Sequence, residues 1–342
     1  MKPAIIYPSR DALLAACQSR DGELKMGQMV TIADEFTDLN LTPCRFALIG
    51  IPEDIGPRAN LGRGGATEAW GAFLTAFLNL QSNAFMTAAD ILVLGEVDCR
   101  DLQLTSKNHP TPVALRDLCA QLDDRVSDVI EAVFAAQMIP IVIGGGHNNA
   151  YPIIKACSQV HNMPLAVANL DPHADFRALE GRHSGNPFHY ASNFQFLTKY
   201  AVLGLHEQKN NQTSLEAMQA LGMIWYSIQQ THWQNTHNYD QCLEHIAKYL
   251  LESGLPIGVE LDLDAISDMP SSAMTTAGLP LRDALYYVDQ MGMLPHVQYL
   301  HIAEGAPPLH ANGLEEGNRV VGQTIAELVS TFIKAMCRSN DM

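Results

Sequence analysis

The sequence has little basic charge and no long apolar run. It contains 21 lysines and arginines against 37 aspartates and glutamates, so its formal net charge is −16. A chain this acidic is expected to bind neither nucleic acid nor an anionic membrane. No stretch offers the 18 or so uninterrupted apolar residues that a membrane span needs. The N-terminus lacks a basic segment followed by an apolar run, so no secretory signal is expected.

Paired cysteines and nucleotide-binding motifs are also missing. The seven cysteines are scattered, odd in number and without a CxxC pair. This pattern indicates free thiols in a reducing, cytoplasmic environment and argues against a disulfide framework or a zinc knuckle. The glycine-rich stretch 52–66 contains neither GxGxxG nor GxxxxGK[ST], which excludes the common phosphate loops. These absences leave an acidic cytoplasmic enzyme as the expected class.

Short apolar segments alternate with helical patterns from residue 45 onward. Eight segments are predicted to be buried strands: 45–51, 90–95, 139–143, 164–168, 200–205, 223–227, 255–262 and 297–302. This alternation is typical of parallel strands joined by crossover helices. We therefore predict one α/β domain over 44–342, preceded by an N-terminal elaboration over 1–43. A TIM barrel would show the same pattern, which does not separate a barrel from an open sheet.

Metal-ligand side chains gather where three of these strands are predicted to end. They are His147, Asp171, His173, Asp175, Asp262 and Asp264. Asp171, His173 and Asp175 alternate, so they point the same way if the chain stays extended. Ligands of parallel α/β proteins bind outside the carboxyl ends of the strands. The oxygen-rich set favours Mn²⁺ or Mg²⁺ over a thiolate zinc site, and six ligands suit a pair of ions.

The charge of this predicted site indicates the charge of its substrate. Two divalent cations would cancel the charge of four aspartates, and a bridging hydroxide would leave the centre negative. A cationic substrate group would restore neutrality, whereas an anionic phosphate would not. This argument points to a metal-activated hydroxide that attacks a positively charged carbon, such as that of an amidinium or guanidinium group.

Three motifs at the predicted strand ends carry a resemblance to a known family. GGGH at 144–147, DxHxD at 171–175 and DxD at 262–264 resemble the ureohydrolase family of arginase, agmatinase and formimidoylglutamase, over roughly residues 45–335. The resemblance implies a three-layer α/β/α fold around a mostly parallel eight-stranded sheet, two Mn²⁺ ions per chain, and homo-oligomers, usually trimers or hexamers. It assigns one ion to His147, Asp171, Asp175 and Asp262, and the other to Asp171, His173, Asp262 and Asp264, with Asp171 and Asp262 bridging.

Within this family, several features are most similar to formimidoylglutamase. GGGH stands where arginase and agmatinase usually have GGDH, SGNPF at 184–188 is similar to SGTPF, and the 58–63 loop is similar to that of this branch. The implied reaction is the hydrolysis of N-formimino-L-glutamate to L-glutamate and formamide. Arg177 is predicted to bind a substrate carboxylate through its guanidinium fork, and Ser184 and Asn186 are predicted to line the substrate site.

Two further residues are predicted to act on the substrate. Glu304 matches the family's acid that pairs with the cationic amidine and so positions its carbon. His183 is adjacent to the histidine position of arginase and is predicted to shuttle protons to the leaving group.

Departures from the family pattern leave the substrate open. Asn186 replaces a threonine, residues 265–276 lack the usual Pro-Gly turn, and Gly-Ala-Pro follows Glu304. An arginase, agmatinase or other guanidino-acid hydrolase that releases urea is therefore the alternative. A catalytically idle metal-binding scaffold is a third reading.

Overall fold

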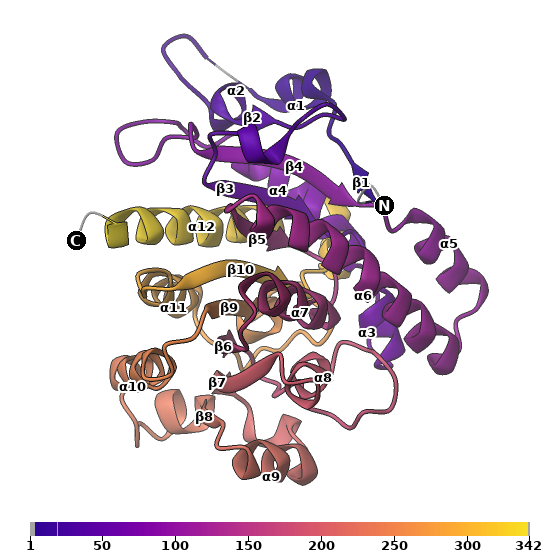
Figure 1. The fold of residues 1–342 in the computed structure, drawn as a ribbon, viewed down its shortest axis with the longest axis vertical. Helices are drawn as coiled ribbons and strands as arrows, with labels where there is room; N and C mark the ends of the chain where they lie inside the picture. The colour runs from indigo at the N-terminus through magenta and orange to yellow at the C-terminus, as the bar shows by residue number, and fades with distance from the viewer. Residues whose placement is uncertain (1–3, 19, 341–342) are drawn as a thin grey trace.

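A ten-stranded sheet forms the middle layer of the protein, whose computed structural model describes residues 4–18 and 20–340. The strand order is β1-β4-β3-β5-β10-β9-β6-β7-β8, and β2 pairs with β4 beside this path. Figure 1 shows the strands descending from β4 to β8. The strands are β1 (Ile5–Ile6), β2 (Thr31–Ile32), β3 (Phe46–Gly50), β4 (Ile91–Val97), β5 (Ile139–Ile143), β6 (Leu165–Leu170), β7 (Leu197–Leu205), β8 (Ile224–Ser227), β9 (Ile257–Asp262) and β10 (Val297–Ala303).

The eight strands from β4 to β8 are all parallel, and they match the eight predicted segments. The sheet is open, with β1 and β8 at its two edges. The predicted three-layer α/β class is therefore confirmed, and the TIM barrel is excluded. Two short strands were not predicted, β1 antiparallel to β4 and β2 parallel to it. Each is only two residues long, which is too short for a periodic pattern to reveal.

Helices cover both faces of the sheet (Figure 1). They are α1 (Arg10–Ala16), α2 (Met26–Met29), α3 (Ile55–Ala59), α4 (Ala69–Phe77), α5 (Arg100–Asn108), α6 (Pro112–Ala135), α7 (Ala150–His161), α8 (Pro187–Asn193), α9 (Gln212–Ala220), α10 (Tyr239–Leu251), α11 (Leu281–Gly292) and α12 (Leu314–Asn340). One apolar core joins the sheet to α4, α10, α11 and α12, and a second joins it to α3 and α5 to α9. Alternate strand residues feed the two cores, Leu48 the first and Ile49 the second.

Short helical turns complete the chain. The 3₁₀ turns are Leu39–Leu41, Ala66–Glu68, His147–Asn149, Glu207–Lys209, Leu263–Ala265 and Pro307–Leu309, and Gln229–Trp233 is a π-helical turn. Two of the 3₁₀ turns lie just past β5 and β9, the first after three intervening residues and the second directly after the strand, where metal ligands are predicted.

Helix α12 is the one described helix that is long and apolar enough to cross a membrane. It is mostly buried, because 67% of its apolar window lies inside the protein. A Cβ at Gly322 would lie 2.3 Å from the Ala72 carbonyl oxygen, so the glycine permits a close approach to α4. The burial of its apolar face indicates that α12 packs against the sheet as a helix of the outer layer.

Candidate metal centre and substrate cavity

The predicted ligands come together because their strands are neighbours. β5, β10, β9 and β6 lie side by side and parallel, so their carboxyl ends share one edge of the sheet. At the end of β5, Gly144 and Gly145 adopt φ of 87° and 70°, a left-handed backbone that favours glycine. A Cβ on Gly145 would lie 2.9 Å from the Ile51 carbonyl oxygen. The two glycines thus turn the chain sharply and bring His147 back over the sheet.

His147 is fully buried among carboxylates. Its Nδ1 lies 3.1 Å from an oxygen of Asp171, 3.1 Å from Asp175 and 3.4 Å from Asp262. Neither ring nitrogen has a hydrogen-bond partner of acceptable geometry in the described chain. Buried polar atoms normally have such partners. One histidine nitrogen and three carboxylates whose ligand atoms lie within 4.8 Å of one another therefore fit a divalent cation.

A second group adjoins the first. His173, Asp262 and Asp264 offer ligand atoms within 4.8 Å of one another. His173 Nδ1 lies 3.4 Å from Asp171 Oδ1 and 3.9 Å from Asp264 Oδ2. The two oxygens of Asp171 thus face different histidines, since its Oδ2 lies near His147. The two groups together offer ligand atoms for two ions that share carboxylates, and all six predicted ligands lie in them.

The convergence of the 171–175 segment arises differently from the prediction. Strand β6 ends at Leu170, and the following residues form an irregular loop. Asp175 adopts φ of 44°, which an extended strand does not allow. The N–H of His173 donates to Asp171 Oδ1 at 2.6 Å, which tightens the loop. The expected alternation along an extended chain is therefore wrong, although the three side chains do converge.

Burial dominates the electrostatics of this cluster. Burial raises the pKa of Asp262 well above its usual value and raises that of Asp175, with neighbouring carboxylates adding to both shifts. Burial opposes charge at Asp171 as well, but the adjacent imidazoles of His147 and His173 outweigh it and lower its pKa to about 2. Several carboxylates buried together are costly unless cations neutralise them. This electrostatic demand also fits a pair of divalent ions.

Glu304 lies beside the cluster at the end of β10. Its Oε1 accepts a hydrogen bond from the N–H of His147 at 2.8 Å. Burial, followed by the nearby charge of Asp264, raises its pKa to about 8. The residue also lines the cavity, so it can meet a cationic group, which would favour its ionised form.

A buried glutamate that was not predicted holds two loops of the site together. The carboxylate of Glu53 accepts hydrogen bonds from the N–H groups of Ile55 (2.6 Å) and Gly146 (2.7 Å). It also accepts from the side-chain amides of Asn148 (3.2 Å) and Asn149 (2.8 Å). Glu53 thereby links the loop after β3 to the turn that carries His147. The two adjacent asparagines after GGGH were the available signal.

A cavity of about 630 Å³ opens over the cluster. Its lining includes five side chains that belong to the cluster or lie beside it: His173, Asp175, Asp262, Asp264 and Glu304. We call this part of the lining the metal end.

The lining also includes three cationic side chains, those of Arg63, Arg177 and Lys209, which we call the cationic wall. The guanidinium of Arg63 donates to the carbonyl oxygens of Ser271 (3.2 Å) and Ser272 (3.0 Å). The structure gives the side chains of Arg177 and Lys209 no hydrogen bond or ion pair within the described residues. Arg63 and Lys209 were not predicted to bind substrate, and the spacing of Lys209 carries no signal.

Not every predicted substrate residue reaches this cavity. Ser184 lines it, but His183 and Asn186 lie behind its wall. The side-chain oxygen Oδ1 of Asn186 accepts from Arg182 at 2.8 Å, and its Nδ2 donates to the backbone carbonyl oxygen of Gly181 at 2.8 Å. Burial lowers the pKa of His183 to about 3. The geometry therefore does not support direct substrate contact by Asn186 or a proton shuttle through His183.

Arg182 is turned inward and clamps the same loop. Its guanidinium donates to Asp123 at 2.8 Å and to the carbonyl oxygen of Asn148 at 2.8 Å. Its charge lies over the rings of Tyr151 and Tyr190, at 4.6 Å and 4.9 Å. This arginine supports the loop from behind the cavity.

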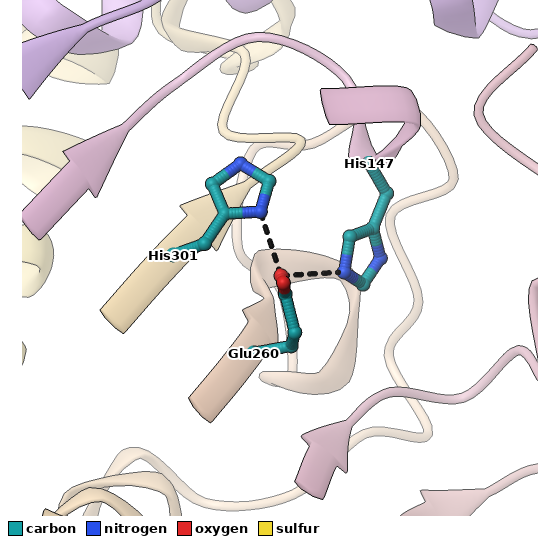
Figure 2. A group of neighbouring side chains, drawn as sticks. All are labelled: His147, Glu260 and His301. Carbon is teal, nitrogen blue, oxygen red and sulfur yellow. Dashed lines mark hydrogen bonds and ion pairs between the residues drawn. The ribbon is translucent and has the colours of Figure 1, made fainter. Parts of the chain in front are cut away.

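Behind His147 lies a further buried group that the sequence did not single out. Figure 2 shows Glu260 between His147 and His301. Their ligand-type atoms also lie within 4.8 Å of one another. A glutamate two residues before Asp262, in an otherwise apolar strand, was the available signal.

Comparisons with known proteins agree with this geometry. The Arginase family model matches residues 44–332. Formimidoylglutamase of Chromobacterium violaceum is 28% identical over 240 residues, which cover 68% of this chain and 69% of that protein. Formimidoylglutamase of Streptococcus pyogenes serotype M3 is 32% identical over 200 residues, 55% of each chain, so the chain spans about half the length of that relative.

Solved structures share the fold. Formimidoylglutamase from Bacillus subtilis aligns with a TM-score of 0.75 at 18% identity, over 94% of both chains. Trypanosoma cruzi formiminoglutamase with Mn²⁺₂ aligns with a TM-score of 0.70 at 18% identity, over 91% of this chain and 98% of that one. Because the family model covers most of the sequence and the six motif residues converge in space, the chain belongs to the arginase family.

Proposed function

We propose that this protein is a binuclear-manganese hydrolase of a linear amidine, most like formimidoylglutamase. In this reaction water cleaves the C–N bond of N-formimino-L-glutamate and gives L-glutamate and formamide. The observation that carries the proposal is the convergence of His147 Nδ1 with three carboxylates, of which Asp175 and Asp262 line the cavity. Relatives named formimidoylglutamase support the choice of substrate.

The metal ligands follow from the two groups. One Mn²⁺ would be held by His147, Asp171, Asp175 and Asp262, and the other by Asp171, His173, Asp262 and Asp264. When bound, the two ions would supply Lewis acidity and an activated water molecule. Asp171 and Asp262 are proposed to bridge, because each faces both groups.

The chain's own residues would orient the substrate between two opposite charges. Glu304, at the metal end, is proposed to pair with the cationic amidine and to hold its carbon over the ligands. At the cationic wall, Arg177 and Lys209 are proposed to bind the carboxylates of the glutamate moiety, because both are cations without a described partner. Ser184 remains a proposed contact of the substrate.

Buried neighbours are proposed to support this surface. Since Asn186 and His183 lie behind the cavity wall, we assign them to the support of the 178–186 loop. This assignment replaces the substrate contact and the proton shuttle expected from the sequence.

We also propose the cellular setting and the assembly. The acidic charge and seven free cysteines favour the cytoplasm. The family resemblance favours a homo-oligomer, a trimer or hexamer. Residues 1–43 are proposed to be an N-terminal elaboration of the single domain over 44–342, because they add β1, β2, α1 and α2 at the β4 side of the sheet.

A product assay tests the substrate. Full-length protein loaded with Mn²⁺ is incubated with N-formimino-L-glutamate, arginine, agmatine and a guanidino acid, and formamide and urea are measured. We expect formamide from the first substrate and little urea from the others. Urea from arginine alone would contradict the proposed substrate. If none of the compounds is turned over, the proposal that the protein is a hydrolase is contradicted.

A further inference from the structure

A buried hydrogen-bonded group stands directly behind His147. Glu260 and His301 are register partners on the adjacent strands β9 and β10. The Nδ1 atom of His301 lies 2.6 Å from Glu260 Oε2, and the hydroxyl of Tyr299 donates to Glu260 Oε1 at 2.8 Å. All three side chains are fully buried. Both oxygens of the glutamate are therefore held in place from one strand.

The backbone makes room for this group. Gly258 lies two residues before Glu260, on the same face of β9. A Cβ at Gly258 would lie 2.4 Å from the hydroxyl oxygen of Tyr299. The glycine thus leaves the space through which the tyrosine reaches the carboxylate, and a larger residue would displace the ring.

His147 needs an acceptor on its far side. Its Nδ1 faces Asp171, Asp175 and Asp262, so Nδ1 is the atom available to a metal ion. A neutral imidazole that gives the lone pair of Nδ1 to a metal carries its proton on Nε2. Among the described carboxylates, Glu260 is the one that faces Nε2, with Oε2 at 3.4 Å (Figure 2).

We propose that Glu260, held by Tyr299 and His301, is a positioning residue for His147. It orients the ring and favours the tautomer that presents Nδ1 to the metal end. The inference rests on the proposed metal centre. Only one of the two proposed ligand sets contains His147, so Glu260 governs the affinity of one ion more than that of the other. Loss of such an outer partner lowers metal affinity by about 10–100-fold.

A binding experiment on the chelator-stripped, full-length protein tests this role without catalysis. Mn²⁺ is titrated in, and the free ion is measured by electron paramagnetic resonance. We expect two ions in the wild type. In Glu260→Gln we expect one ion to bind about 10–100-fold more weakly, while the other retains its affinity and the signal of the coupled ion pair is lost at limiting Mn²⁺.

Two tyrosines provide a matched pair of variants. Tyr299→Phe removes the hydroxyl that donates to the Glu260 carboxylate, whereas Tyr287→Phe removes one that donates to the Glu260 backbone oxygen at 3.1 Å. Both tyrosines are fully buried. We expect the first variant to weaken the same ion as Glu260→Gln, by a smaller factor, and the second to leave both affinities unchanged.

The outcomes separate this inference from the proposed function. Equal weakening of both ions in Glu260→Gln, unchanged affinities, or equal effects of the two tyrosine variants would overturn the positioning role. If Glu260→Gln does not fold, the tyrosine pair alone decides. A wild type that binds fewer than two Mn²⁺ ions would instead contradict the metal centre itself.

Discussion

The metal end and the cationic wall are built in different ways, although they line one cavity. Asp171 and Asp262 are buried, lie at the ends of neighbouring strands and accept hydrogen bonds from the backbone. Arg177 lies on a loop and Lys209 in the 3₁₀ turn Glu207–Lys209, and neither side chain has a partner in the described structure. The strand ends thus hold the two aspartates that are proposed to bridge the ions, while segments outside the strands, which tolerate change, hold the cations that are proposed to bind the substrate.

The strongest test of this contrast removes a shared ligand. In Asp262→Asn we expect the activity to fall by about 10³-fold or more, since one lost charge disturbs both groups and exceeds the effect of an outer partner. The measurement is steady-state hydrolysis with saturating Mn²⁺. Asp117→Asn, the same chemical change on the exposed side of α6, is the control and should keep full activity. Comparable losses in both variants would contradict the metal mechanism.

The support of the cationic wall can be tested through Arg182. Arg182→Leu leaves Asp123 buried without its partner, which costs about 3 kcal/mol or more of the free energy of unfolding. Urea denaturation measures this loss. Arg116→Leu breaks the pair between the half-buried Arg116 and the exposed Glu180 of the same loop and should cost about 1 kcal/mol, well below the loss in Arg182→Leu. Equal losses would show that Arg182 does not clamp the loop from within.

Removal of metal should destabilise the metal end. With Mn²⁺ at 100 times its dissociation constant, we expect the folded state to gain about 2.7 kcal/mol relative to the chelator-stripped protein. A rise in melting temperature on addition of Mn²⁺ reports this gain. Asp262→Asn should show a smaller rise. An identical rise in wild type and variant would place the ion elsewhere on the protein.

The smallest effect is expected at the cationic wall. Arg177→Met should raise the KM for N-formimino-L-glutamate by about 10-fold and leave kcat nearly unchanged, because a charged hydrogen bond to the substrate tail is lost in the ground state and the transition state alike. Lys107→Met, on the exposed last turn of α5, is the control. A loss in kcat at constant KM would place Arg177 in the chemistry and so break the contrast between the two ends.

Much of the fold and of the metal end could be predicted from the sequence. The apolar runs are long enough to mark the eight parallel strands, and crossover connections place their carboxyl ends at one edge. The positions of His147 and Asp262 in the site could be predicted from that shared edge alone. The path of Asp175 did not, since its left-handed backbone depends on tertiary contacts that local periodicity does not encode.

The remaining parts depend on contacts distant in sequence. The role of His301 depends on its register partner Glu260 on the neighbouring strand. Which strands are neighbours cannot be predicted from the sequence of one strand. Lys209 lines the cavity from a short turn after β7, and no sequence pattern predicts the path of the chain there. Asn186, in contrast, belongs to a recognised motif. Its side-chain amide bonds within its own loop, so the motif predicted the position of the segment but not the direction of this side chain.

The buried carboxylate of Glu53 has a practical consequence for anyone who wishes to redesign the enzyme. It binds the segment after β3 and the turn after β5 through one set of hydrogen bonds. Segments 52–56 and 144–149 must therefore be exchanged together in a chimera. The loop residues 207–211 take no part in those bonds, but Asn210 accepts from the N–H of Ala174 at 2.7 Å and donates to the carbonyl oxygen of Pro172 at 2.9 Å, within the segment that carries Asp171 and Asp175. Asn210 must therefore be kept when Lys209 is varied to change substrate preference.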